Sequence, residues 1–216
     1  MRSMLLCLLV ISCGDPAGRA APGDSLAVVA EPLLPIFAGG TTGRHIVCTV
    51  GDSTCVPAMA LLQQMRPDLL IANHCREGSQ TPEILDHQWA KNSRAMQNCD
   101  VVVTLGGIND ISANLPIEQS IGRLTGIADE ATALGIDAYG MVPIPYRIGQ
   151  PYGATVQAKM DQLQAGLRGA LLPVHVVDLH ADFQAHQEYY LGGSDWIHPG
   201  ELGQAHIAGA LADAIP

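Results

Sequence analysis

The sequence predicts an α/β protein: a three-layer α/β/α sandwich built around a five-stranded parallel sheet. Two observations carry this prediction. First, five short runs of mostly apolar, often β-branched residues alternate with longer amphipathic segments. Second, apolar character is nearly continuous within each run, which is typical of parallel strands buried on both faces. Such alternation requires right-handed crossovers, which place helices on both faces of the sheet.

The elements follow in a regular order along the chain. The five expected strands span residues 45–50, 68–73, 100–106, 136–143 and 174–179. The expected helices lie in the segments that begin VPAMALL, TPEILDH, PIEQSIG, ATVQAKM and GELGQAH. In the third of these segments, apolar residues recur at intervals of three and four and form one face, and Gly135 follows as a C-terminal stop. A chain of 216 residues with no internal repeat fits one such domain.

Charge and hydropathy exclude two classes of protein. The net charge is -10 at pH 7, whereas nucleic-acid binding depends on Lys and Arg, so no nucleic-acid partner is expected. After the first dozen residues, no apolar run reaches the roughly 20 residues that span a bilayer, so no membrane-spanning domain is expected there.

The N-terminus has the layout of a short secretory signal. Arg2 precedes an apolar stretch from Met4 to Ile11, and the letters VISC that end at Cys13 resemble the lipobox of bacterial lipoproteins. In a lipobox the cysteine is lipidated and becomes the new N-terminus. The alternative is a plain signal peptide, cut near Ala20 or Ala21. Both interpretations predict export to the cell envelope or periplasm, and the first predicts a membrane-anchored lipoprotein held by its lipid alone.

Pro, Gly and Ala dominate the next part of the chain, which is the composition of a tether. We therefore expect a signal peptide at residues 1–12, a lipidated N-terminus and tether at residues 13–43, and one folded domain at residues 44–216.

The sequence Gly-Asp-Ser occurs twice, ending once at Ser25 and once at Ser53. Ser25 lies in the tether, whereas Ser53 directly follows the first expected strand and precedes a helix. Ligands of parallel sheets bind at the carboxyl ends of the strands. A serine on such a strand-to-helix turn has its hydroxyl at that edge, as in a nucleophile elbow. The context favours Ser53 as a nucleophile over Ser25, although a Gly-Asp-Ser taken alone is usually a simple turn.

Three further polar residues follow the third and fifth strands. Asn109, in LGGIND, can donate a hydrogen bond to a developing oxyanion. Asp195 and His198, in SDWIHPG, can supply a base and the carboxylate that orients it. Each motif has a simpler reading, as a capped turn or a chance pair. Their common position at one edge of the sheet favours an active site.

These motifs resemble those of the SGNH hydrolase superfamily, the GDSL-type esterases and lipases, over residues 44–216. Gly51-Asp52-Ser53 resembles its first sequence block, GIND its third, and DWIHP its fifth. The segment NHCREGSQT resembles the second block, with Gly78 at the position of the oxyanion glycine. Two positions depart from the family pattern: Thr54 replaces the leucine of GDSL, and Glu77 stands where serine is common.

The resemblance implies a flavodoxin-like fold and a serine esterase that hydrolyses acyl esters through an acyl-serine intermediate. Acetyl or short-chain acyl groups on carbohydrate or lipid are the substrates considered. The implied roles are nucleophile for Ser53, base for His198 and orienting carboxylate for Asp195. The backbone amides of Ser53 and Gly78 and the side chain of Asn109 would form the oxyanion hole. No metal or cofactor is implied.

Three alternatives stay open at this stage. The same residues fit an O-acyltransferase that uses a sugar hydroxyl as acceptor. A lipoprotein that binds glycans or lipids without catalysis is the second alternative. The third is a flavodoxin-like nucleotide binder, although GDSTC lacks the glycines and lysine of a phosphate loop. The sequence leaves the acyl chain, the alcohol and the oligomeric state undetermined.

Four cysteines fall in the expected domain. We expect them to be free and buried, with Cys48 in the core and Cys99 at the far end of the sheet. A bridge between Cys55 and Cys75 is the one pairing considered, because both belong to the carboxyl edge and an exported protein can keep disulfides.

Overall fold

A computed structural model describes residues 44–147, 154–170, 175–192 and 197–216. All of these residues belong to one compact unit of the chain, Ile36–Pro216. The expected signal, tether and lipidated Cys13 lie outside the described residues, as does Ser25. Among the helices that are described, none is long and apolar enough to cross a bilayer.

The described residues contain the predicted five-stranded sheet. Its strands are all parallel and lie in the order β2-β1-β3-β4-β5. Their bounds agree with the sequence prediction to within a residue: β1 His45–Gly51, β2 Leu69–Asn73, β3 Val101–Leu105, β4 Asp137–Val142 and β5 His175–Asp178. The strand order reverses at β1, which has β2 on one side and β3 on the other. The carboxyl ends of β1 and β3 therefore flank the expected ligand position.

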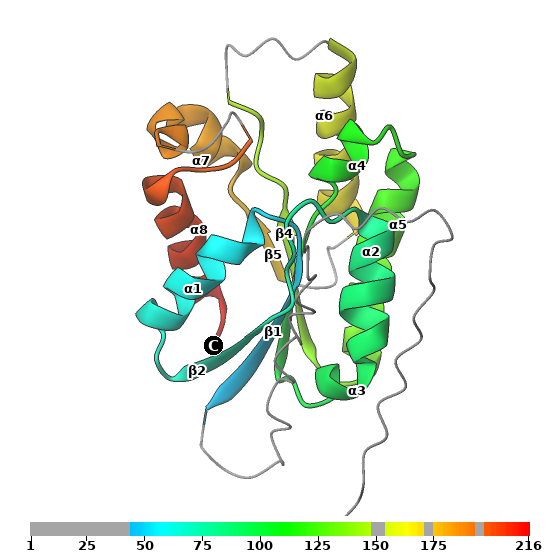
Figure 1. The fold of residues 1–216 in the computed structure, drawn as a ribbon, viewed down its shortest axis with the longest axis vertical. Coiled ribbons are helices and arrows are strands. Elements are labelled where there is room, and N and C mark those ends of the chain that lie inside the picture. Colours follow the sequence, from blue (N-terminus) through cyan, green and yellow to red (C-terminus); the bar gives the residue numbers. More distant parts are fainter. Residues whose placement is uncertain (1–43, 148–153, 171–174, 193–196) are drawn as a thin grey trace, which may run out of the picture. The chain divides into compact units, whose positions relative to one another are not determined.

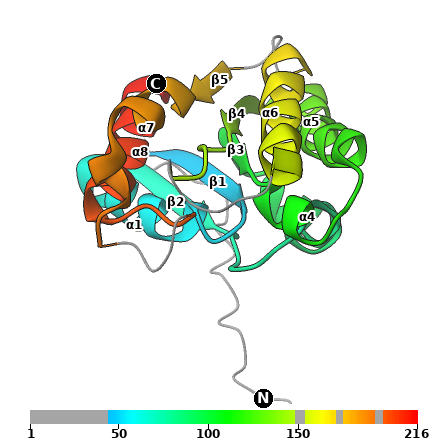
Figure 2. The ribbon, with the colours of Figure 1, turned by 90° about the horizontal axis from the view of Figure 1, so that it is seen from above.

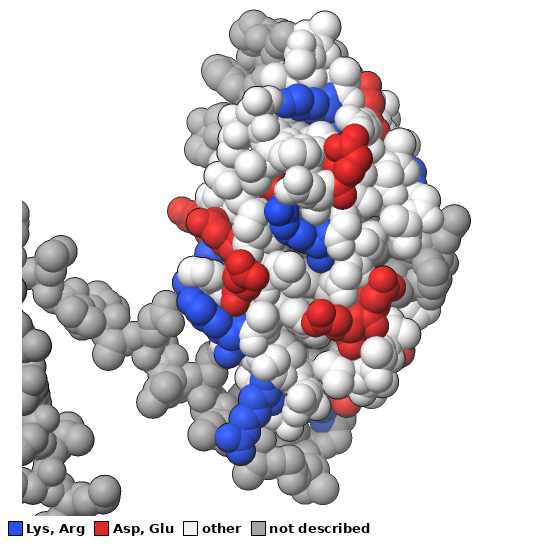
Figure 3. All heavy atoms as spheres, turned by 90° about the vertical axis from the view of Figure 1, so that its right-hand side faces the viewer, with Lys and Arg blue, Asp and Glu red and all other residues white. Residues whose placement is uncertain are grey.

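Helices cover both faces of the sheet, so the three-layer prediction is confirmed (Figures 1 and 2). One face carries α1 (Cys55–Met65), α7 (His180–Ala185) and α8 (Glu201–Ala214). The other carries α2 (Thr81–Glu83), α3 (Ser93–Met96), α4 (Ile108–Ser112), α5 (Ile117–Ala133) and α6 (Ala154–Ala170). On the side of the molecule that Figure 3 shows, acidic and basic side chains are interspersed.

Two cores result, one on each side of the sheet. Every residue of β3 is buried, and successive residues point to opposite faces. Val102 packs in the core with α5 and α6, whereas Val101 and Val103 pack in the core with α1 and α8. The nearly continuous apolar runs in the sequence are therefore explained by strands that are buried on both faces, as expected.

The second expected helix is not one regular helix. After α2, the chain forms a π-helical segment (Ile84–Trp89), then a 3₁₀ turn (Ala90–Asn92), and then α3. The consecutive side chains of Gln88 and Trp89 are both buried, with 1% and 3% of their surface exposed. A wider turn at this point lets both reach buried partners, and the indole of Trp89 donates to Glu130 Oε2 at 2.6 Å.

The expectation of free cysteines is wrong, because the four cysteines among the described residues form two disulfides. Cys55 and Cys75 are joined, with 6.0 Å between their Cα atoms. Cys48 and Cys99 are joined as well, with 5.9 Å between their Cα atoms. The second bridge forms because the chain enters β3 beside β1, where Cys48 and Cys99 lie on the same face of the sheet.

Candidate active site

Ser53 lies in the turn that joins β1 to α1, where the sequence places it. Its neighbours Asp52 and Thr54 are buried, whereas Ser53 itself is partly exposed. The side-chain carboxylate of Asp52 accepts a hydrogen bond from the Thr54 N–H at 3.0 Å. The backbone carbonyl of Asp52 accepts one from the Cys55 N–H at 3.2 Å. These bonds fix the turn, so the serine hydroxyl is held at the carboxyl edge of the sheet and at the N-terminus of a helix.

His198 reaches this turn from the C-terminal part of the chain. Its Nε2 lies 2.7 Å from the hydroxyl oxygen of Ser53, and both side chains are partly buried. This distance is within hydrogen-bond reach, as a base needs in order to take a proton from a nucleophile. Asp195, the expected orienting carboxylate, lies outside the described residues.

Gly78 and Asn109 lie beside Ser53 in the same cavity. The backbone of Gly78 has a φ of +71°, a left-handed conformation that favours glycine. Asn109 follows β3 in the first turn of α4, and its amide nitrogen donates to the carbonyl of Ser79 at 3.0 Å. An asparagine amide has two hydrogens, so a second donor remains on Asn109 for a ligand.

The cavity that contains these groups has a volume of about 1060 Å³. It is lined by Ser53, Gly78, Asn109 and His198, so four of the five predicted catalytic and oxyanion residues meet there. Its lining also includes small or apolar side chains from the first two turns of α1 and α8: Pro57, Ala60, Leu61, Leu202 and Ala205. A nucleophile and base therefore face a space that accepts an uncharged organic group.

Asp52 and Asp110 are buried carboxylates next in sequence to Ser53 and Asn109. Asp52 is fully buried, and that burial raises the pKa of its carboxyl to about 6. The hydrogen bonds from Thr54 and the nearby charge of His198 counteract part of this rise, whereas the charge of Asp110 adds to it.

The role of Asp110 was not anticipated from the sequence. Its carboxylate accepts hydrogen bonds from the Thr81 N–H at 2.9 Å, the Thr81 hydroxyl at 2.6 Å and the Ser120 hydroxyl at 2.8 Å. It therefore joins the starts of α2 and α5 directly beside Asn109. Its position in the GIND motif was the only signal available.

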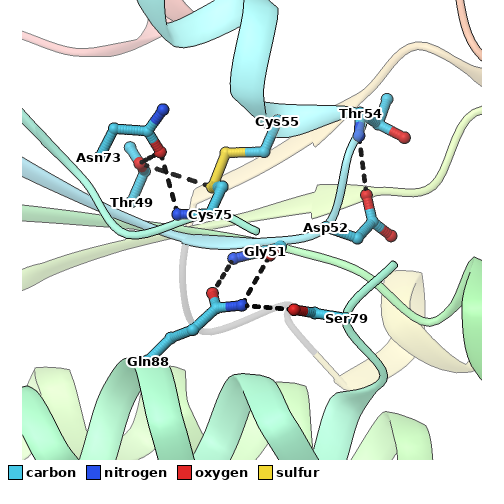
Figure 4. The surroundings of a disulfide bond; sticks show 9 residues. All are labelled: Thr49, Gly51, Asp52, Thr54, Cys55, Asn73, Cys75, Ser79 and Gln88. Carbon is cyan, nitrogen blue, oxygen red and sulfur yellow. Dashed lines mark hydrogen bonds between the residues drawn. A yellow bond between two sulfur atoms is a disulfide. The ribbon is translucent and has the colours of Figure 1, made fainter. Parts of the chain in front are cut away.

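The loop after β2 is tied to the end of β1 from both sides (Figure 4). On one side stands the Cys55–Cys75 disulfide. On the other, the buried side chain of Gln88 hydrogen-bonds both to Gly51 and to the hydroxyl of Ser79. In addition, the Arg76 N–H donates to the carbonyl of Gly51 at 3.0 Å. These contacts hold the loop that carries Gly78 against the turn that carries Ser53.

A family model described as "GDSL-like Lipase/Acylhydrolase family" matches residues 37–206. A search of curated proteins found no match.

Several solved structures share the fold at low sequence identity. An acetyl xylan esterase, AlAXEase, superposes with a TM-score of 0.67 and 15% identity, covering 79% of this chain and 100% of that one. A lipase/acylhydrolase from Enterococcus faecalis gives 0.65 and 15%, covering 80% and 95%. A catalytic mutant of an acetylxylan esterase from Geobacillus stearothermophilus gives 0.63 and 19%, covering 80% and 95%. At these identities, the likeness shows the fold alone.

Proposed function

Because the chain belongs to the GDSL-like lipase/acylhydrolase family, whose members hydrolyse esters, we propose that it is a serine esterase that removes acetyl or short-chain acyl groups from carbohydrate or lipid. The observation that carries the proposal is the 2.7 Å separation between Ser53 Oγ and His198 Nε2 inside the cavity.

In the first half of the proposed reaction, Ser53 Oγ attacks the ester carbonyl carbon while His198 Nε2 accepts its proton. The carbonyl oxygen becomes an oxyanion, which the backbone amides of Ser53 and Gly78 and the side-chain amide of Asn109 stabilise. Asp195 would orient the imidazole and stabilise its charged form. When the tetrahedral intermediate collapses, the protonated His198 gives its proton to the leaving alcohol, and the acyl group remains on Ser53.

In the second half, a water molecule takes the place of the alcohol. His198 removes a proton from this water as its oxygen attacks the acyl carbon, and the same donors stabilise the second oxyanion. Collapse releases the carboxylic acid, and the proton returns from His198 to Ser53 Oγ. The turn, the base and the donors thus serve both halves of the cycle.

Two observations support an acyl ester of carbohydrate as the substrate class. Two of the solved structures compared above are named as acetyl xylan esterases. In addition, the described residues that line the cavity are mostly uncharged, with acidic side chains at Glu77 and Glu201. An uncharged sugar ester suits this lining better than an anionic substrate does.

We also propose that the protein is exported and held on the membrane by a lipid on Cys13. The two disulfides of the described domain support this, because disulfides persist in oxidising compartments. Labelling cells with a radioactive fatty acid tests the anchor. The wild-type protein should incorporate label and stay with membranes, whereas Cys13→Ser should do neither; equal labelling of both would contradict the anchor.

The activity is tested with p-nitrophenyl esters from acetate to decanoate and with acetylated xylo-oligosaccharides, using the Ser53→Ala protein as control. We expect the highest kcat/KM for the shortest acyl chains and loss of turnover in the control. Adding a candidate sugar acceptor and analysing the products separates hydrolysis from acyl transfer. Equal activity of wild type and control on every ester would overturn the proposal.

A further inference from the structure

The carboxamide of Gln88 binds the last residue of β1 through both of its polar atoms (Figure 4). Its Oε1 accepts the Gly51 N–H at 2.7 Å, and its Nε2 donates to the Gly51 carbonyl at 2.9 Å. The same nitrogen donates to the hydroxyl of Ser79 at 3.0 Å. Three of the hydrogen bonds available to a glutamine amide are thus made inside the protein, where only 1% of the residue is exposed.

The π-helical segment accounts for this placement. Residues Ile84–Trp89 form a wider turn than an α-helix, and such turns occur often at functional sites. The wider turn lets Gln88 point toward β1 while the next residue, Trp89, also packs in the core. A regular helix would bury fewer consecutive side chains on the same face.

Gln88 joins the two parts of the site that must stay in register. Gly51 lies two residues before Ser53, and Ser79 directly follows Gly78. The carbonyl of Ser79 also accepts the hydrogen bond from Asn109. One side chain therefore links the turn of the nucleophile to the loop that carries the oxyanion donors, without itself lining the cavity that contains Ser53.

We propose that Gln88 is a positioning residue for ester hydrolysis: its carboxamide fixes the distance between Ser53 and the donors Gly78 and Asn109. This inference rests on the proposed function. Catalytic groups must be held within about 0.5 Å of their productive position, and a displacement of about 1 Å can cost about 100-fold in rate.

The chain offers a matched control for this role. Gln164 is equally buried, with 1% exposed, but its amide makes a single described hydrogen bond, to the carbonyl of Pro143 at 2.8 Å. Gln88→Met and Gln164→Met both replace a buried amide by a side chain of similar length. Gln164→Met loses one described buried hydrogen bond. Gln88→Met loses three, and with them the link between turn and loop.

The test measures kcat and KM on p-nitrophenyl acetate at a temperature where both variants are folded by circular dichroism. For Gln88→Met we expect kcat to fall roughly 10- to 100-fold with KM changed less than about threefold, because the transition state loses more than the ground state. For Gln164→Met we expect kcat within about twofold of wild type. Equal kcat values for Gln88→Met and wild type would overturn the positioning role.

A second variant decides the matter should Gln88→Met fail to fold. In Gln88→Glu, a protonated carboxyl keeps one donor and one acceptor for Gly51, whereas the ionised form has no donor. Burial raises the pKa of such a carboxyl. The ratio of its kcat to that of wild type should therefore rise as the pH falls from 8 to 6. A ratio that does not change with pH would contradict the proposal.

The Ser53→Ala protein separates this inference from the proposed function. If Ser53→Ala hydrolyses esters as wild type does, the proposed function itself fails. If Ser53→Ala is inactive while Gln88→Met turns over at the wild-type rate, only the role of Gln88 is overturned.

Discussion

The hydroxyl oxygen of Ser53 and Nε2 of His198 lie 2.7 Å apart, although 145 positions separate the two residues in the chain. Their approach follows from the parallel topology. The turn after β1 and the segment before α8 both reach the carboxyl edge of the sheet, where ligands of this fold class bind. Nucleophile and base are therefore assembled only by the complete fold.

The first prediction concerns which Gly-Asp-Ser copy is reactive. Ser53→Ala should abolish ester hydrolysis, because no other hydroxyl is expected to replace the atom that forms the acyl-enzyme. Ser25→Ala should keep nearly full activity. The measurement is the rate of p-nitrophenol release by the two purified variants and wild type. Loss of activity only in Ser25→Ala would reverse the assignment.

Much of the fold was predictable because parallel strands carry a strong signal. Runs such as residues 100–106 are apolar at most positions, and each of the five runs fell on a strand. The position of Ser53 was predictable for the same reason, since it directly follows such a run. The literal GDSL string at residues 23–26 carries no such context, so the flanking pattern was more informative than the motif.

The interactions that brace the site were not predictable from the sequence. Gln88 has the pattern of a polar residue in an amphipathic helix, and only the π-helical turn directs it inward. The Cys48–Cys99 bridge depends on strand adjacency, which neither cysteine's local sequence encodes. Both features arise from tertiary contacts between segments that are distant in the chain.

The second prediction concerns the two disulfides, which close loops of different length. Loop-closure entropy gives about 3 kcal/mol of stability for the Cys55–Cys75 bridge, with a separation of 20 residues. It gives about 4 kcal/mol for Cys48–Cys99, with a separation of 51. Each cysteine pair is replaced by serine, and urea unfolding measures the free energy of unfolding. The loss should be larger for the Cys48–Cys99 pair than for the Cys55–Cys75 pair.

Loss of the Cys55–Cys75 bridge should lower activity more than loss of the Cys48–Cys99 bridge does, although it costs less stability. The Cys55–Cys75 bridge joins the first residue of α1 to the loop that leads to Gly78, so its loss should lower kcat several-fold in protein that is still folded. The double serine variant at Cys48 and Cys99 is the control, because that bridge lies away from the cavity. A larger drop in kcat for this control would refute the argument.

The third prediction concerns pH and Asp52. The pKa of its carboxyl is raised by burial from 3.8 to about 6. Asp52 therefore binds a proton more tightly in the folded chain than in the unfolded chain. The stability from this proton is fully present below about pH 3.8 and is lost as the pH rises through about 6. The loss is on the order of 3 kcal/mol.

Asp52→Asn tests this, because asparagine does not titrate and keeps an oxygen for the Thr54 N–H. The free energy of unfolding of this variant, relative to wild type, should rise between pH 4 and pH 7. Urea titrations at several pH values measure it. Asp213→Asn removes an exposed carboxylate and controls for the loss of one negative charge. A pH-independent difference between Asp52→Asn and wild type would exclude the linkage.

The fourth prediction concerns close packing at the end of β1. A Cβ atom on Gly51 would lie 2.5 Å from the backbone oxygen of Leu105, which cannot rotate away. Gly51→Ala should therefore cost about 1–3 kcal/mol of stability. Gly209, inside α8, has no atom within 4 Å of such a Cβ. Gly209→Ala should instead gain about 0.5–1 kcal/mol, and thermal unfolding should give opposite signs for the two variants.

The fifth prediction concerns Asn109 as an oxyanion donor. Removing one such donor costs about 2.7–4 kcal/mol of transition-state stabilisation, so Asn109→Ala should lower kcat roughly 100- to 1000-fold. KM should change little, because the charge on the oxygen develops only in the transition state. The loss of the hydrogen bond to Ser79 should lower the free energy of unfolding by about 1 kcal/mol.

The control for this prediction is Asn98→Ala. It removes an exposed amide bonded to the carbonyl of Arg94, and it should leave both kinetic constants unchanged. If kcat falls no more in Asn109→Ala than in Asn98→Ala, Asn109 is not an oxyanion donor. Its side chain would then serve only to bind the carbonyl of Ser79.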